Sequence, residues 1–235
     1  MLALLAVLSW PVRAVDPPPL VFVAARNNTL PLAHFDGDRL ESGLLRDLGD
    51  LLAERLGRRA KYLTLPARRT ERALVEGQAD LMCYVMPAWV SVPLNWSVPV
   101  LPDAQLLVAR SDAPKLESLQ QLAGRRVGTV LGYTYPKPQQ LLGEQLRRED
   151  AVHMEGNLRK LMVGRLEYAF TEQLALSAFL KSNPEAALRV ELVLERFTAP
   201  CAVSPRSPVP LSELNRALRQ LQQDGAIDAL LARYR

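Results

Sequence analysis

The sequence has few residues of the kinds that bind metals or perform covalent chemistry. Its 235 residues include two histidines and two cysteines, and aromatic residues make up 6% of the chain. His34 and His153 are far apart and have no Cys or carboxylate partners at ligand spacing, so we predict no metal site and no cofactor. The lysines and arginines are scattered rather than clustered with aromatics, which argues against nucleic-acid binding despite the net charge of +4.

Long apolar runs are also absent, apart from one near the N-terminus. Leu2 to Trp10 is apolar but too short to span a bilayer. Val12 and Ala14 suit signal-peptidase cleavage after Ala14, so we predict a secretory signal peptide over residues 1–14 and a periplasmic protein. No Lys or Arg precedes Arg13, and a buried first helix is the alternative.

The two cysteines, Cys83 and Cys201, both lie in apolar segments that have the pattern of strands. An even number in an exported protein permits one disulfide, and two buried free thiols are the alternative. The remaining composition, 49% hydrophobic and 23% charged, is that of an ordered chain with one large or two small domains.

Short apolar strands alternate with amphipathic helices in the first hundred residues. Strands are predicted at 20–24, 60–65 and 81–86, and helices at 42–56 and 68–77. This order predicts α/β architecture, with a mostly parallel sheet covered by helices on both faces. In such sheets ligands bind beyond the carboxyl ends of the strands. The loops there are 25–31, 65–69 and 87–91, which hold Asn28, Arg69 and Trp89, and Met86 directly precedes the third loop.

The same pattern returns in the second half of the chain. A strand at 126–130 leads through Gly132 to a predicted helix that continues to Arg148, and the C-terminal segment predicts two helices separated by Gly225. The chain therefore contains two α/β units of about 90 residues each. The apolar link at 96–112 is expected to be an ordered crossover rather than a flexible tether.

Six segments resemble, in order, the motifs of one family. They are SGLLRDLGDLLAERLG, ALVEGQADL, LNWSVPV, LESLQQLAGRRVGTVLGYTY, LMVGRLEYAFTE and LNRALRQLQQDGAIDALLARY. Each match is weak alone, but together they cover nearly the whole chain after residue 14. The sequence resembles the bacterial periplasmic solute-binding proteins of family 3, the amino-acid-binding components of ABC transporters.

This resemblance implies a two-lobe, type II periplasmic-binding fold joined by two crossover strands. Residues 20–100 and 201–235 would form the first lobe, and residues 101–200 the second. It also implies that the strand carrying Cys201 returns beside the strand carrying Cys83, which would allow the disulfide. The implied function is capture of a small polar or amino-acid-like ligand by hinge closure and delivery to an inner-membrane ABC permease. We expect a monomer.

One motif of the amino-acid binders is missing. Family members usually carry an Arg about six residues before the position of Trp96, where it forms a bidentate salt bridge with the ligand carboxylate. The corresponding residue is Val90, and no Arg or Lys lies between Asp80 and Leu101. Trp89 could instead stack on an aromatic, sugar or quaternary-ammonium ligand, or it could pack at the cleft rim without touching ligand.

Other candidates for ligand contact each have a simpler explanation. Glu172 matches the acidic residue that holds the ligand amino group in the family, but it also opens a helix, where a carboxylate is favoured anyway. Arg69, preferred over Arg68, could supply the missing cation or be an exposed residue at a helix start. Tyr133 and Thr134 precede a helix N-terminus that could bind an anion. Asn28 could serve only the turn.

Two other functions remain open from the sequence. The chain could be a ligand-sensing module that binds without transport, acting through a sensor protein. It could also be a dehydratase acting on a prephenate-like substrate, which would need a positioned acid or base in the cleft. Glu172 is the one strong candidate for such a group, and no nucleophile–base pair is apparent, so we predict a binding protein rather than an enzyme.

Overall fold

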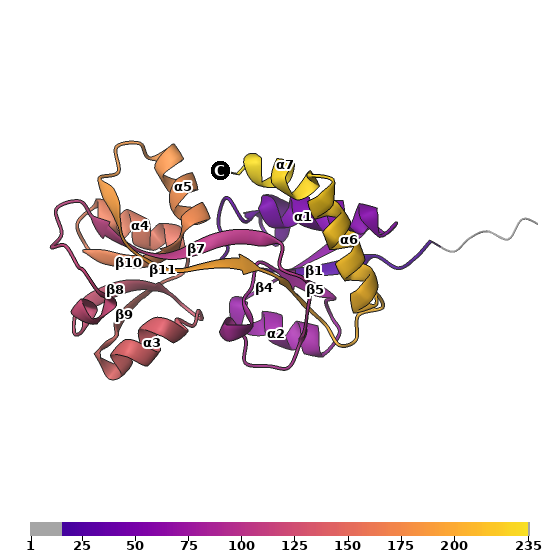
Figure 1. Ribbon diagram of the computed structural model, residues 1–235, viewed down its shortest axis with the longest axis horizontal. Coiled ribbons are helices and arrows are strands. Elements are labelled where there is room, and N and C mark those ends of the chain that lie inside the picture. Colours follow the sequence, from indigo (N-terminus) through magenta and orange to yellow (C-terminus); the bar gives the residue numbers. More distant parts are fainter. Residues whose placement is uncertain (1–15, 235) are drawn as a thin grey trace, which may run out of the picture.

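The computed structural model describes residues 16–234, so the predicted signal peptide at 1–14 lies outside the described residues. Figure 1 shows two groups of helices and strands joined by two long strands that run between them. Each group is built on a five-stranded sheet, and a short hairpin, β2 (His34–Asp36) with β3 (Arg39–Ser42), forms a third sheet. The predicted two-lobe α/β architecture is therefore present.

The first lobe contains both ends of the described chain. In sheet order its strands are β4 (Ala60–Leu65), β1 (Leu20–Ala25), β5 (Leu81–Cys83), β12 (Cys201–Val203) and β6 (Asn95–Trp96). Its helices are α1 (Leu44–Arg55), α2 (Ala67–Val75), α6 (Leu211–Gln223), α7 (Ala226–Ala232) and the short 3-10 helix η1 (Pro87–Trp89).

The second lobe has the sheet order β11 (Leu188–Ala199), β7 (Leu101–Arg110), β10 (Tyr168–Glu172), β8 (Arg126–Val130) and β9 (Arg147–Ala151). Its helices are α3 (Pro136–Leu142), α4 (Met154–Met162) and α5 (Gln173–Ser182), with the 3-10 helices η2 (Leu119–Leu122) and η3 (Gly143–Gln145).

Both five-stranded sheets are mixed rather than mostly parallel. In the first, β1 pairs in parallel with β4 and β5, while β12 pairs antiparallel with β5 and β6. In the second, β8 pairs in parallel with β9 and β10, while β7 pairs antiparallel with β10 and β11. The antiparallel pairs arise where the chain crosses between lobes, because a strand that returns directly lies antiparallel to its neighbour.

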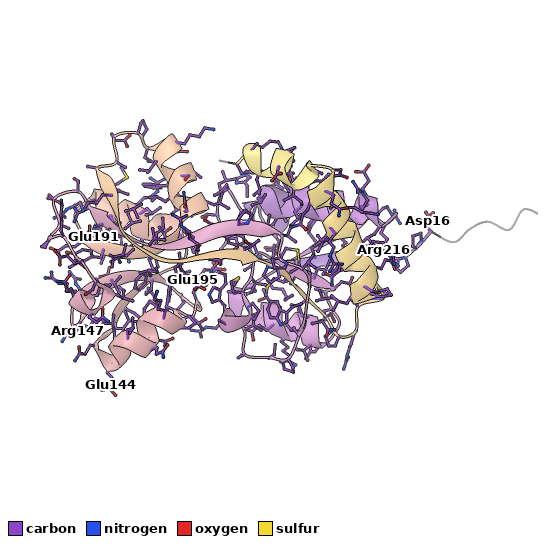
Figure 2. All side chains as sticks on the ribbon, in the orientation of Figure 1. Asp16, Glu144, Arg147, Glu191, Glu195 and Arg216 are labelled. Carbon is purple, nitrogen blue, oxygen red and sulfur yellow. A yellow bond between two sulfur atoms is a disulfide. The ribbon has the colours of Figure 1, made fainter. Side chains whose placement is uncertain are left out.

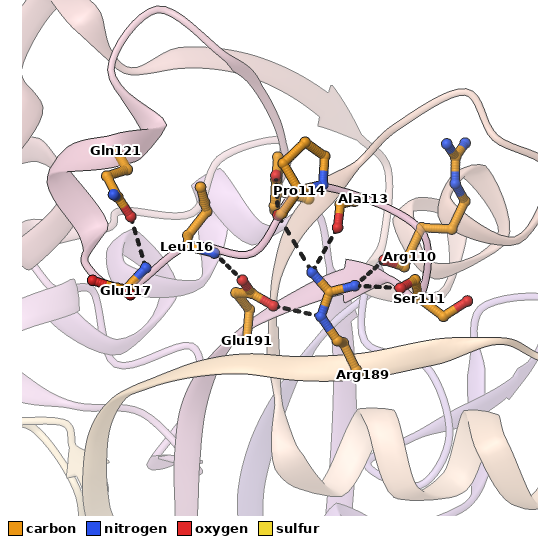
Figure 3. Close-up of polar contacts among 10 residues, drawn as sticks. Arg110, Ser111, Ala113, Pro114, Leu116, Glu117, Gln121, Arg189 and Glu191 are labelled. Atoms are coloured by element: carbon orange, nitrogen blue, oxygen red, sulfur yellow. Dashed lines mark hydrogen bonds and ion pairs between the residues drawn. The ribbon is translucent and has the colours of Figure 1, made fainter.

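The two crossover strands are β7 and β11. They pair antiparallel from Leu101 opposite Ala199 to Arg110 opposite Leu188, with two bulges in β11. At the far end of this pair, Arg189 donates hydrogen bonds to the carbonyl oxygens of Arg110, Ser111, Ala113 and Pro114 and forms an ion pair with Glu191 (Figure 3). This network ties the loop after β7 to β11 within the second lobe.

Buried leucines position the helices on the sheets. In α1, Leu44, Leu48 and Leu52 are fully buried at helical spacing, and in α6 Leu214, Leu218 and Leu221 are buried in the same way. Charged side chains lie mainly outside: Glu144 and Arg147 project from the outer end of the second lobe (Figure 2). Among residues 16–234, the structure contains no helix with the length and apolarity needed to cross a membrane.

Two predicted elements end earlier than the sequence suggested. The strand at 81–86 stops at Cys83, because Tyr84 adopts a φ of 61° and leaves the extended conformation. The predicted helix up to Arg148 ends at Leu142, where Gly143 takes a φ of 52°, and the edge strand β9 follows. Ser42 does not cap α1, since it belongs to β3 and Gly43 occupies the cap position without a side-chain hydrogen bond.

A disulfide joins Cys83 on β5 to Cys201 on β12, which lie opposite each other in the antiparallel register. Cys201 follows the end of β11 by two residues, so the bond lies in the first lobe directly beside the crossover. The two cysteines are separated by 118 residues in sequence. A bridge across so long a loop strongly restricts the unfolded chain.

Replacing both cysteines, Cys83→Ser with Cys201→Ser, is expected to lower the free energy of unfolding by about 2–5 kcal/mol, because the unfolded chain regains the entropy of the open loop. Urea unfolding of the variant and of the oxidised parent protein measures the difference. Complete alkylation of both thiols in native, unreduced protein would contradict the assignment.

Candidate functional site

A cavity of about 120 Å³ lies between the two lobes, at the carboxyl ends of the parallel strands. The first lobe contributes Asn28 after β1, Thr70 and Glu71 on α2, and Tyr84 and Trp89 after β5. The second lobe contributes Gln105 on β7, Gly132 to Tyr135 after β8, and Glu172 at the end of β10. The cavity is therefore built from strand ends and helix starts of both lobes, as the three predicted loops required.

Glu172 is the central polar group of this cavity. It is the last residue of β10 and directly precedes α5, and its side chain is 4% exposed. Its Oε2 is buried and has no hydrogen-bond partner in the part of the chain that the structure describes. Burial, and secondly the negative charge of Asp103, raise the pKa of the Glu172 carboxyl from 4.5 to about 8. The carboxyl is therefore mostly protonated at neutral pH while the cavity is empty.

Asp103, on the crossover strand β7, is the better-solvated partner of this carboxylate pair. Tyr84 donates its hydroxyl hydrogen to Oδ2, and the backbone N–H groups of Ala104 and Leu174 donate to Oδ1 at 2.7 and 3.2 Å. Burial raises the pKa of Asp103, but these donors oppose the effect. The negative charge of the pair is thus best placed on Asp103, and the proton on Glu172.

Tyr84 reaches Asp103 because of an unusual backbone conformation. It is the one residue other than glycine with positive φ among residues 16–234. For a bulky side chain this left-handed conformation costs about 1–2 kcal/mol, and such strain tends to be retained at functional sites. The conformation ends β5 and directs the tyrosine hydroxyl toward the crossover, so that a first-lobe residue contacts the carboxylate pair of the second lobe.

The sequence left open whether Trp89 contacts ligand or only packs at the cleft rim. The residue lines the cavity, and its ring packs edge-on against Phe197 of β11 with ring centroids 5.3 Å apart. The indole is thus held by a crossover strand while part of it remains available to the cavity. No Lys, Arg or His is found among the described residues that line this cavity, so the missing carboxylate clamp is not replaced from a neighbouring element.

The loop before α3 brings the second lobe into contact with the first. Tyr133 donates a hydrogen bond from its hydroxyl to Asn28 Oδ1 at 3.1 Å, and Thr134 Oγ1 lies 3.5 Å from the carbonyl oxygen of Trp89. Arg148 holds this loop from behind by donating to the carbonyl oxygens of Val130 and Tyr133. The five predicted residues Asn28, Trp89, Tyr133, Thr134 and Glu172 therefore meet at one cavity.

Arg69 and Met86 do not line this cavity. In α2 the residues that do are Ala67, Thr70 and Glu71, one helical face, and Arg69 is exposed on another. Arg68, not Arg69, lies near the second lobe: a Cβ on Gly132 would be 3.6 Å from its Cγ. Met86 packs against the core of the first lobe instead, because the turn at Tyr84 shifts the alternation of side chains.

The predicted anion site at the start of α3 is weak in the structure. Pro136 and Pro138 have no backbone N–H, and the N–H groups of Tyr133 and Gln139 already donate within the loop and helix. Two of the first three positions of α3 therefore have no backbone N–H to donate.

Several lining residues escaped the sequence analysis, among them Glu71, Tyr84 and Gln105, and so did Asp103, which accepts the hydrogen bond from Tyr84. Gln105 is 6% exposed and lies opposite Glu172 in the antiparallel pairing of β7 with β10. A buried polar residue within the apolar run Leu101–Arg110 was the available signal for Gln105 and Asp103. Nothing in the sequence marks Tyr84 for a left-handed conformation.

Replacing Glu172 with Gln is expected to change how stability depends on pH. Between pH 4.5 and about 8 the folded parent keeps a proton that the unfolded chain releases, so its free energy of unfolding falls as pH rises. Glu172→Gln removes this term. Its stability relative to the parent should therefore rise from pH 5 to pH 8, by on the order of 1 kcal/mol per pH unit.

Urea unfolding at several pH values measures this effect. Glu144→Gln is the matched control, because Glu144 is exposed at the outer end of the second lobe. If the Glu172→Gln and Glu144→Gln variants show the same pH dependence, Glu172 does not hold a proton in the folded state.

Comparison with known proteins agrees with this geometry. The model of the bacterial extracellular solute-binding proteins, family 3, matches residues 21–235. An ABC transporter arginine-binding protein 1 of Escherichia coli (strain K12) is 24% identical over 139 residues, which are 57% of this chain and 56% of that protein. The alignment thus spans little more than half the length of this relative.

Solved structures show the same fold. An ancestral arginine-binding protein bound to arginine has a TM-score of 0.74 at 20% identity, covering 92% of this chain and 97% of that one. The GluR0 ligand-binding core in complex with L-glutamate has a TM-score of 0.76 at 16% identity, covering 95% and 99%.

A histidine kinase sensor domain similar to periplasmic binding proteins has a TM-score of 0.74 at 19% identity, covering 92% and 95%. Such structures support the fold, while the family model supports the assignment from sequence. The chain belongs to the bacterial extracellular solute-binding proteins, family 3.

Proposed function

We propose that this solute-binding protein is exported through its N-terminal segment, residues 1–14, and captures a small ligand in the cavity between its lobes. The observation that carries this proposal is the unpartnered, buried Oε2 of Glu172 in a cavity lined from both lobes. A buried carboxylate oxygen without a donor is costly, and a ligand that supplies the donor removes that cost. The proposed ligand is a small polar or amino-acid-like molecule.

Hinge closure is the proposed mechanism of capture. Residues 20–100 with 201–235 would move as one lobe against residues 101–200, and bending would be taken up near the ends of β7 and β11. The contacts Tyr133–Asn28 and Thr134–Trp89 belong to the closed arrangement. A ligand that contacts Trp89 and Glu172 together would favour this arrangement, since it binds the closed form better than the open one.

Delivery to an ABC permease is the proposed purpose of binding. The arginine-binding relative is a component of such a transporter, which supports an inner-membrane permease as the partner. A sensor role is the second candidate, because a histidine kinase sensor domain shares the fold. The two differ in their consequence: a transporter component is needed for uptake of its ligand, whereas a sensor domain is not.

A thermal-shift screen of residues 15–235 tests the binding function. Amino acids, amines, aromatic acids and sugars form the panel, and a ligand that binds only the folded protein must raise the melting temperature. We expect one chemical class to do so. Well-folded protein that responds to no class would contradict a solute-binding role for this cavity.

Trp89→Ala then tests whether the cavity is the binding site. The affinity for the ligand found in the screen, measured by calorimetry, should fall at least severalfold because an aromatic wall is lost. Trp96→Ala is the matched control, since Trp96 is a half-buried tryptophan of the same lobe that does not line the cavity. Equal losses of affinity in the two variants would place the site elsewhere.

A further inference from the structure

The charged groups that line the cavity are all acidic. Of the described lining residues, Glu71 and Glu172 are the two carboxylic acids, and the negative charge of nearby Asp103 acts on Glu172. Four aromatic side chains complete the wall, namely Tyr84, Trp89, Tyr133 and Tyr135. Carboxylates among aromatic rings form an environment that attracts cations through charge and through the ring quadrupoles.

The polar atoms of the second-lobe wall also favour a ligand that donates hydrogen bonds. The orphaned Oε2 of Glu172 can accept when the carboxyl is ionised, and the amide of Gln105 lies beside it on the same sheet face. An ammonium group donates only and carries the charge that an ionised Glu172 needs. It therefore satisfies this wall better than a neutral hydroxyl.

A carboxylate on the ligand would find no cationic side chain among the described residues that line this cavity. Arg68 is exposed beside Gly132 and is not among the lining residues, and the Arg148 guanidinium is already engaged by two carbonyl oxygens and by Asp150. At the start of α3, Pro136 and Pro138 have no backbone N–H to donate. A buried carboxylate without donors or a cation is strongly disfavoured.

We infer that the site selects a small organic cation, whose ammonium group binds between the Glu172 carboxylate and the aromatic wall, and that no carboxylate on the ligand is required. This inference rests on the proposed function, since it assumes that the cavity is the solute site. The cavity of about 120 Å³ is smaller than the roughly 300 Å³ and above that holds drug-sized ligands, which favours a small amine.

Binding such a cation should release a proton. The groups that face Glu172 are Asp103 from β7, Tyr84 from the first lobe, and Tyr133 and Tyr135 from the loop before α3. Burial raises the pKa of each tyrosine, so all three stay neutral, and the titrating group near pH 7 is Glu172. The ammonium group takes the place of the proton that neutralises this carboxyl in the empty cavity.

Matched ligand pairs test the selectivity. Isobutylamine is compared with valine, and agmatine with arginine, because each amine lacks only the carboxylate of its amino acid. Calorimetry on residues 15–235 at pH 7.5 should show at least one amine binding ten times or more tightly than its amino acid. Amino acids that bind as well as or better than both amines would overturn the inference while leaving the solute-binding function intact.

Absence of binding by any of these four compounds, together with a response to sugars or aromatic acids in the thermal-shift screen, would likewise overturn the inference alone. Absence of any response in folded protein would overturn the proposed function and the inference with it.

The pH dependence of the tighter amine tests the role of Glu172. Alkylammonium groups keep their charge well above pH 8, so a change in affinity reports the protein. Affinity should rise about tenfold from pH 6 to pH 7 and level off above about pH 8. Glu172→Gln should bind weakly with a flat profile, and Glu144→Gln should match the parent. A flat profile in the parent would rule out Glu172 as the counter-ion.

Discussion

The antiparallel pairing of β7 with β11 is the constraint on which the rest of the structure depends. It joins the two lobes through ten registered residues of β7. It also supplies Gln105 to the cavity wall, Asp103 as acceptor for the Tyr84 hydroxyl, and Phe197 as support for Trp89. Because these residues lie on the crossover strands, the proposed hinge bending would act directly on the cavity. The Cys83–Cys201 disulfide restrains the chain next to the first-lobe end of this strand pair. The hydrogen bonds of Arg189 restrain its second-lobe end.

The second important feature is a buried carboxyl oxygen without a hydrogen-bond donor. Glu172 Oε2 has no donor in the described structure, in a lobe whose other buried polar groups are largely partnered. Protonation lowers the cost of this arrangement, since a neutral carboxyl loses less hydration than an ionised one. The site is thus stable in its neutral form, and under the proposed binding of a cation it would become charged. Stability and ligand recognition therefore depend on the same proton.

The fold could be predicted from the sequence because its signals are local and repeated. Apolar strands, leucine stripes and the left-handed glycines Gly57 and Gly225 define most elements, and the order of six motifs defines their connection. The edge strand β9 was not predicted, because its sequence RREDA is polar and pairs on one side only. The cavity was predicted less well. The face of α2 that lines it carries Ala67, Thr70 and Glu71 rather than Arg69, and Tyr84 reaches Asp103 through a left-handed conformation that the sequence does not mark.

The loss of the arginine clamp is best understood together with these unpredicted residues. Val90 occupies the clamp position in the first lobe, and Tyr84, six residues earlier, donates to Asp103. The first lobe thus donates a hydroxyl hydrogen bond to a carboxylate of the second lobe. It does not offer a cation to a carboxylate of the ligand. A ligand shifts a hinge only by the difference in its affinity for the two arrangements. With the acidic group fixed in the second lobe and the indole in the first, that difference must come from a group that attracts both, and a cation does so.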